Sequence, residues 1–233
     1  MTDSSDRIMY AAKPTADSAI QRDAQKLQWA VRESVSSSPG AFLADIDDID
    51  AKLASDWIDE IRLSTWAIVQ RGDEILGIAA AKRPDRDKDK DVNQSTARFI
   101  ESVWIAGAMR RRGIGRRLVE YLIDIEREKH HVQQFLLWVF DTNEPATDLY
   151  EDLGFKRTGE EKWLARANAK EIKYQLLLDS AVLTTAELRS RRSARENDWR
   201  MYSVRYRILG DQTVIGFNCS AARMRPLSDS SDQ

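Results

Sequence analysis

The chain has 233 residues, 42% of them hydrophobic, with a formal net charge of −2. This length suits one domain with an appendage, and the slight negative charge argues against a protein that coats nucleic acid. No apolar run approaches the roughly 18 residues of a membrane span, and the first ten residues do not resemble a signal peptide. We therefore expect a cytoplasmic protein without a membrane partner. The single cysteine, Cys219, cannot form an internal disulfide.

The first third of the chain mixes helical and strand patterns. Apolar residues recur at helical spacing in two segments, and strand-like runs flank the turn residues RGDE. The expected elements, in chain order, are a short strand at 8–12, a helix that ends at the SSSPG of 36–40, a helix from about Asp47 to Leu63, and strands at 66–70 and 75–82.

The middle of the chain begins with a charged loop at 84–91. The loop alternates Asp with Lys or Arg, but it lacks the glycine and glutamate that a calcium loop needs at its sixth and twelfth positions, so no metal site is expected. Regular elements follow the loop in an order typical of a mixed α/β sheet of the α+β type. They are a strand at 96–106, a glycine-rich turn, a helix through Leu118 to Ile125, a buried strand at 135–140, a helix from about Pro145 to Gly154 and a strand at 170–178.

The last part of the chain reads as an extension. Residues 185–196 have a helical, arginine-rich pattern. Alternating residues from Tyr202 to Ile208, a turn at Gly210 and a second run from Val214 to Phe217 predict a β-hairpin. We therefore divide the chain into a domain at 1–180 and an extension at 181–233 with a disordered tail.

The turn GAMRRRGIGRR lies between a predicted strand and a strong helix. Glycines let backbone N–H groups approach a ligand, and the helix start adds about half a positive charge. We expect the amides between Met109 and Arg116 to converge on a diphosphate, helped by the arginines. A third glycine for a dinucleotide fold is absent, as is a P-loop. A basic patch for nucleic acid and a purely structural turn are the alternatives.

Two motifs in this region resemble the GNAT acetyltransferase superfamily. In that family a strand ending in V-x-P leads into [RQ]xxGx[GA], and here Ile105, Gly107, Arg110, Gly113 and Gly115 stand at the matching offsets, with Gly107 in place of the proline. Further on, the run from Leu137 to Glu160, LWVFDTNEPATDLYEDLGFKRTGE, is similar to the family's second motif. The resemblance covers about residues 45–178.

The resemblance implies an N-acetyltransferase with acetyl-CoA as co-substrate and an amine, in a small molecule or a protein, as acceptor. It implies a GNAT fold, in which two parallel strands of the central sheet splay apart and the acceptor pocket is built from the first two helices and late loops. Tyr150 corresponds to the residue that protonates the departing thiolate, and the N–H of Ile105 would stabilise the thioester oxygen. The expected cofactor-binding residues are Trp104, Ile105, Ala106, Arg110, Arg111, Arg112, Gly113, Ile114, Gly115, Arg116 and Asn143.

The acceptor amine must also lose a proton. Glu101 is our candidate base, because strand alternation should place its side chain on the face of Val103 and Ile105. Glu74 and Asp141 are alternatives. Two other functions stay open: a regulatory module that binds acyl-CoA without chemistry, and a C-terminal hairpin that binds a partner or a second copy of the chain through exposed strand edges.

Overall fold

The computed structural model describes residues 16–71, 74–178, 200–204, 206–209, 213–216 and 222–223. Its helices are α1 (Ala16–Ser37), α2 (Ile46–Asp50), α3 (Ala54–Leu63), α4 (Ile114–His130) and α5 (Glu144–Asp152), with short 3₁₀ turns at Pro39–Ala41 and Gly107–Met109. Its strands are β1 (Thr65–Arg71), β2 (Glu74–Lys82), β3 (Ala97–Ile105), β4 (Gln134–Phe140), β5 (Lys156–Leu164), β6 (Ala169–Leu177), β7 (Arg200–Val204), β8 (Tyr206–Leu209), β9 (Thr213–Gly216) and β10 (Ala222–Arg223).

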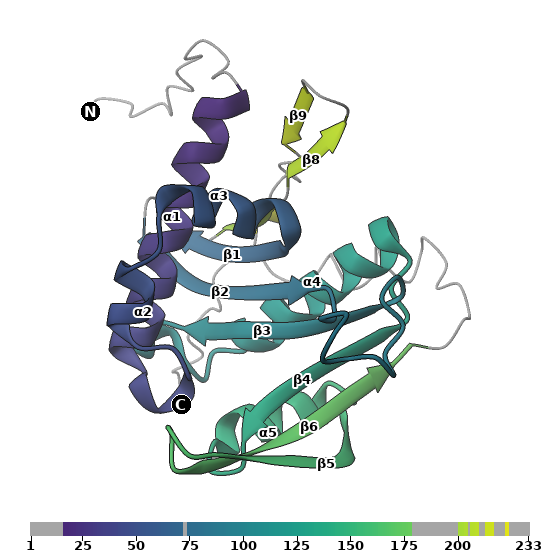
Figure 1. The fold of residues 1–233 in the computed structure, drawn as a ribbon. Helices are drawn as coiled ribbons and strands as arrows, with labels where there is room; N and C mark the ends of the chain where they lie inside the picture. Colours follow the sequence, from purple (N-terminus) through teal and green to yellow (C-terminus); the bar gives the residue numbers. More distant parts are fainter. Residues whose placement is uncertain are drawn as a thin grey trace, which may run out of the picture.

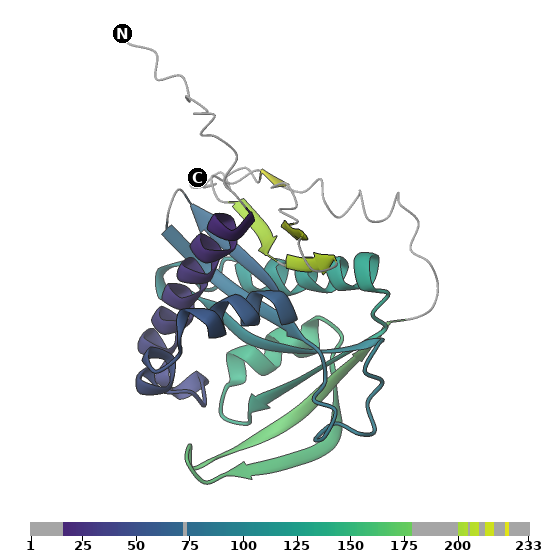
Figure 2. The ribbon, with the colours of Figure 1, turned by 45° about the horizontal axis from the view of Figure 1, so that its top comes forward.

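Eight strands form one mixed sheet in the order β10-β7-β1-β2-β3-β4-β6-β5 (Figure 1). Helices α1 and α3 cover one face of the β1–β3 region, which we call the front (Figures 1 and 2). Helix α4 covers the back of these strands, and α4 and α5 together cover the back of β4 and β6. The predicted mixed α/β fold is confirmed.

Helix α1 shows why the front face forms. Ile20, Ala24, Leu27 and Val31 recur every three or four residues and are buried, which places them on one stripe of the helix. The stripe packs on Ile68 and other front residues of the sheet. The helix therefore forms where its apolar face is covered by the sheet.

Strands β3 and β4 are the only parallel neighbours among the described strands, and they separate soon after they meet. Only Ala97, Arg98 and Phe99 of β3 are in register with β4. Beyond Phe99 the two strands diverge toward their carboxyl ends, as Figure 1 shows. The expected splay is therefore present, and we call the gap between the two diverging backbones the opening.

Two expected elements differ from the structure. The helix predicted over 47–63 is two helices, α2 and α3, because the Asp56 carboxylate accepts a hydrogen bond from the N–H of Leu53 and starts a new helix there. Strand β5 was not predicted. Its sequence, KRTGEEKWL, is largely exposed and lacks an apolar face, as an edge strand can.

The C-terminal segment joins the sheet. Strand β7 pairs antiparallel with β1, and β8 and β9 form a separate hairpin in which Tyr206 lies opposite Gly216. The hairpin prediction is confirmed for these two strands, but the alternating run that we expected to be one strand is divided between β7 and β8. The strand expected at 8–12, the turn at Gly72 and Asp73, the helix at 185–196 and the tail lie outside the described residues.

Candidate active site

A bulge in β3 lies beside the opening. Ser102 has a positive φ of 54°, and the register with β2 shifts between Ile78 and Ala80, so β3 carries one extra residue there. As a result Glu101 lies opposite Ala80 and Trp104 lies opposite Ile78. Glu101 and Trp104 therefore share the front face.

The predicted face of Glu101 is accordingly wrong. Val103 and Ile105 pack on the α4 side of the sheet, whereas the Glu101 carboxylate lies on the front, 3.4 Å from Nζ of Lys82. The extra residue at the bulge reverses the alternation on which the prediction depended. Lys82 also lies 2.6 Å from Glu60 of α3.

Charge and burial act in opposite directions on Lys82. Burial by itself would lower the pKa of Lys82, but the carboxylates of Glu101 and Glu60 outweigh it and raise that pKa above its ordinary value. Lys82 therefore stays protonated and holds Glu101 in an ion pair.

The end of β3 directs one backbone N–H into the opening. Ala106 donates its N–H to the carbonyl of Leu76, at 2.9 Å, on the β2 side. Successive residues of a strand point their N–H groups to opposite edges, so the N–H of Ile105 points toward β4, where the strands have already parted. Ile105 thus occupies the predicted position for a donor to the thioester oxygen.

Unlike Ile105, the neighbouring residues Trp104 and Ala106 do not face the opening. Trp104 is 4% exposed in the core beneath α1, and its ring N–H donates to Ser37. Its backbone, like that of Ala106, belongs to the β2 edge by the same alternation. Neither residue directs a hydrogen-bond donor into the opening.

The glycine-rich turn presents a run of amides that have no partner in the part of the chain that the structure describes. The N–H groups of Met109 and Arg110 are taken by the carbonyls of Ala106 and Gly107, so these two amides are not available as predicted. In the described part of the chain, no backbone carbonyl outside the helices accepts from residues 111–116, and the first turn of a helix has no internal acceptors. We call residues 111–116 the cradle.

Gly113 gives the cradle its shape. It has a φ of 75° as N-cap of α4, and a Cβ built on it would meet nothing within 4 Å. The positive φ suits glycine, and the space in front of it is open. The first turn of α4 has no acidic residue, so the cradle suits an anion such as a diphosphate.

The arginine side chains of this region differ in their contacts. Arg110 donates from Nε to the carbonyl of Ile105, at 2.9 Å, and from Nη2 to the hydroxyl of Ser38, at 2.6 Å. Arg116 is bonded to Asp152 of α5. Arg111 and Arg112 are exposed, and no ion pair or hydrogen bond of their side chains occurs among the described residues.

Tyr150 of α5 lies behind the opening. It is 6% exposed and stacks edge-on against Phe155 at 5.7 Å between ring centroids. Burial raises the pKa of its phenol well above the usual value, so the hydroxyl keeps its proton at any physiological pH. Within the described residues this hydroxyl has no hydrogen-bond partner.

Asn143 is the N-cap residue of α5, directly after β4. Its side chain makes no capping hydrogen bond, and the backbone carbonyl accepts from Ala146 and Thr147 instead. Of the two alternative bases, Glu74 is paired with Arg71 at 2.8 Å, and Asp141 is exposed directly after β4.

A pocket of about 560 Å³ opens on the front, at the carboxyl end of β4. It lies between the segment after α1 and the turn that joins β5 to β6, where the family resemblance puts an acceptor. Arg166 from that turn bonds to Asp45 and, at 3.0 Å, to Asp48, and so bridges the two walls. The lining residues are Val35, Ser36, Pro39, Gly40, Phe42, Leu43, Ala44, Asp45, Ile46, Phe140, Thr142, Arg166, Ala167, Asn168 and Ala169.

None of the site residues predicted from sequence lines this pocket. Its walls come from three distant parts of the chain, and only the short segment with Phe140 and Thr142 overlaps a motif found in the sequence. The only sequence indication was that the resemblance assigns the acceptor to the first helices and late loops.

The comparisons with known proteins agree with this geometry. A family model described as "Acetyltransferase (GNAT) family" matches residues 19–155, more than half of the chain. No curated protein matches this chain. None of the described helices is long and apolar enough to cross a membrane.

Solved structures resemble the chain in fold. A GNAT-family acetyltransferase from Streptococcus pneumoniae has a TM-score of 0.56 at 18% identity, over 68% of this chain and 95% of that one. The protein yncA from Salmonella typhimurium, solved with its cofactor acetyl-CoA, scores 0.53 at 18% identity, over 71% and 94%. NAA60 from Arabidopsis thaliana, in complex with a bisubstrate analogue, scores 0.51 at 14% identity, over 66% and 95%.

At these identities the structures support the fold alone, while the family model covers the splayed strands, the cradle and α5 in one match. The chain belongs to the GNAT acetyltransferase family and is an acyltransferase that uses acetyl-CoA.

Proposed function

We propose that this protein transfers the acetyl group of acetyl-CoA to a primary amine, by direct attack of the amine while both substrates are bound. The observation that carries the proposal is the cradle, a run of amides without a hydrogen-bond partner among the described residues, at the carboxyl end of β3 where β3 and β4 have parted. Acetyl-CoA supplies the activated acyl group as a thioester.

The cradle and Ile105 supply binding and charge stabilisation. The amides of residues 111–116 and the start of α4 would hold the diphosphate, with Arg111 and Arg112 free to approach it. Asn143, at the end of β4, would contact the arm of the cofactor. The N–H of Ile105 would hydrogen-bond the oxygen that gains negative charge during attack.

Tyr150 would protonate the departing sulfur. Its hydroxyl is neutral and has no hydrogen-bond partner within the described residues, as a proton donor to a ligand atom would require. A thiol has a pKa near 8.5, so a thiolate accepts a proton readily near neutral pH. No side-chain nucleophile is needed in this scheme.

The pocket would hold the acceptor, and Glu101 would take its proton through water. Glu101 and Ile105 lie opposite Ala80 and Gly77, a separation of about 10 Å along β2. A direct transfer from an amine at Ile105 to Glu101 is therefore too long. The acceptor is a small molecule or the Lys or N-terminal amine of a protein.

The test combines the purified protein with acetyl-CoA and a panel of amines while free thiol is followed. We expect release of thiol that depends on the amine. Tyr150→Phe should lower kcat by at least about tenfold, within the range of general acid catalysis. The ratio of wild-type to variant kcat should stay constant from about pH 6 to 9.5, because the raised pKa of Tyr150 keeps it protonated there.

Tyr121→Phe is the matched control, since it also removes a phenol hydroxyl but from the α4 residue that packs on the cluster of Leu118 and Leu122. Tight binding of acetyl-CoA without turnover on any amine would contradict the proposal and favour the regulatory module.

A further inference from the structure

We propose that the Arg116 side chain is a positioning residue: it fixes the end of α5, and with it Tyr150, instead of binding phosphate. This rests on the proposed roles of the cradle and Tyr150. It revises the role that the family resemblance implied for the Arg116 side chain, while the Arg116 amide stays in the cradle.

The contacts of Arg116 join the cradle to the last residue of α5. Nη2 donates to the carboxylate of Asp152 at 2.8 Å, and Nη1 donates to the backbone carbonyl of the same residue at 3.3 Å. A cation that bonds the last carbonyls of a helix also interacts favourably with the helix dipole. Glu120, one turn further along α4, lies 3.9 Å from Nη1 and keeps the guanidinium on this side.

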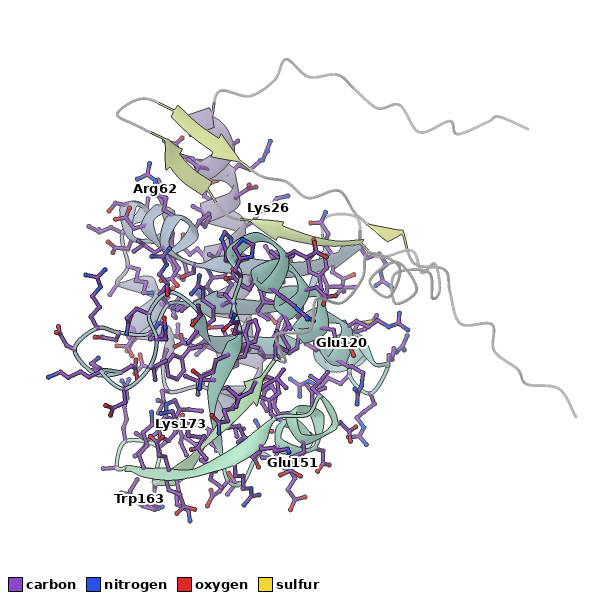
Figure 3. All side chains as sticks on the ribbon, turned by 90° about the vertical axis from the view of Figure 1, so that its right-hand side faces the viewer. Lys26, Arg62, Glu120, Glu151, Trp163 and Lys173 are labelled. Carbon is purple, nitrogen blue, oxygen red and sulfur yellow. The ribbon has the colours of Figure 1, made fainter. Side chains whose placement is uncertain are left out.

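Packing next to Arg116 makes the same connection. A Cβ on Gly115 would lie 3.5 Å from Leu149 of α5 and 3.6 Å from Ile105 of β3. The start of α4 therefore lies close both to the helix that carries Tyr150 and to the strand that carries the thioester donor. In Figure 3, Glu120 marks α4 and Glu151 marks α5, which lie on the same side of the sheet.

A second network holds the other flank of α5. The hydroxyl of Tyr174 donates to Glu151 at 2.9 Å, and Nε of Arg157 donates to the Tyr174 oxygen at 2.8 Å. Tyr150 thus lies next to two residues that are tied to different elements, Glu151 to β5 and β6 and Asp152 to α4. Loss of the Arg116 side chain breaks the connection at Asp152 and leaves the one at Glu151, so we expect a partial loss of kcat.

Arg112 provides the contrast. It lies four residues before Arg116, it is exposed, and its side chain makes no ion pair or hydrogen bond with the described residues. Its guanidinium is available for a phosphate. Arg116 would have to give up Asp152 to bind the same ligand, and that end of α5 would then lose its two hydrogen bonds to the start of α4.

The experiment is a double-mutant cycle on Arg116→Gln and Asp152→Asn. It measures kcat at saturating substrates and the Kd of coenzyme A by calorimetry. Each single variant should lower kcat about three- to tenfold, because small shifts of a catalytic group are costly, and the double variant should be no slower. The Kd should stay within about twofold for all three, while Arg112→Gln raises it several-fold.

Two controls make the cycle specific. In a Tyr150→Phe background, Arg116→Gln should lower kcat no further, whereas a general loss of structure would add to the defect. Lys88→Gln removes another exposed ion pair, to Asp85 at 3.7 Å in a distant loop, and should change neither constant.

A tenfold weaker Kd for Arg116→Gln alone would overturn the inference and make Arg116 a phosphate ligand. Additive losses of kcat in the cycle or in the Tyr150→Phe background would overturn it as well. Failure of the proposed function looks different, since in that case the wild-type protein does not turn over or Tyr150→Phe keeps full activity.

Discussion

The two halves of the sheet differ in how they are covered. Strands β1 to β3 lie between α1 and α3 on the front and α4 on the back, and residues such as Ala67 and Ile68 are buried on both faces. In the described structure, strands β4, β6 and β5 pack against helices only on the back, while Leu136 and Phe140 on the front of β4 are buried without a helix layer of this kind. Their front carries Trp138, with Nζ of Lys162 at 4.2 Å from the ring centre, and ion pairs such as that of Lys173 with Glu160.

The difference shows where the site depends on precise geometry. The halves share only three register pairs between β3 and β4, and the proposed chemistry lies where they part. Their relative position must then be fixed by contacts across the junction. Arg116 with Asp152 makes such a contact at the back, Arg166 with Asp45 makes one at the front, and Arg98 lies inside the shared register.

The largest effect is expected from Arg98→Met at the junction. Arg98 and Glu126 form an ion pair at 2.8 Å with side chains 3% and 0% exposed, and Thr65 of β1 also bonds to Glu126. Removal of one partner leaves a buried charge, which should cost about 3–5 kcal/mol in the free energy of unfolding. Chemical denaturation measures it.

The matched control for Arg98→Met is the double variant Arg98→Met and Glu126→Leu, which removes both charges and should recover part of the loss. A loss below about 1 kcal/mol in the single variant would show that this pair does not hold the junction.

A medium effect is expected from Gly113→Ala in the cradle. At a φ of 75°, a residue with a side chain is strained by about 1–2 kcal/mol. If the backbone of the turn moves to relieve this strain, the amides of the cradle no longer converge, and the Kd of coenzyme A should rise about tenfold. Gly107→Ala is the control, because Gly107 has an ordinary φ and open space around it, so stability should not fall. Unchanged affinity in Gly113→Ala would disprove the role of the cradle's shape.

The smallest effect is expected from Arg166→Gln, which cuts the front contact between the halves. The pocket wall should loosen, so that KM for the amine rises about two- to fivefold, in the range of other exposed charged contacts, while KM for acetyl-CoA stays the same. Arg32→Gln removes a comparable ion pair to Asp50 of α2, at 2.9 Å, outside the pocket, and serves as the control. A fall in KM would mean that the pair blocks the pocket.

The sequence was sufficient for elements with strong apolar patterns or motifs. The buried run of β4 and the glycine turn before α4 were found because burial and a cofactor loop each leave a local pattern. The edge strand β5 has mostly exposed residues and therefore no apolar pattern from which it could be predicted. The break at Leu53 leaves the apolar spacing intact, so the division into two helices could not be predicted either.

The site was predictable only in part for two physical reasons. The bulge at Ser102 places a positive φ on a residue other than glycine, so no residue pattern indicates that Glu101 changes face. The pocket is assembled from residues more than 100 positions apart, as with Asp45 and Arg166, and no local pattern encodes such a contact.

The most direct measurement is a backbone amide titration by NMR with coenzyme A. We expect the amides of residues 111–116 to shift and to become protected from exchange, while those of Met109 and Arg110, already bonded to Ala106 and Gly107, keep their hydrogen-bond partners and their protection. If coenzyme A binds and residues 111–116 stay unprotected, the cradle is not the diphosphate site and the proposed mode of cofactor binding is wrong.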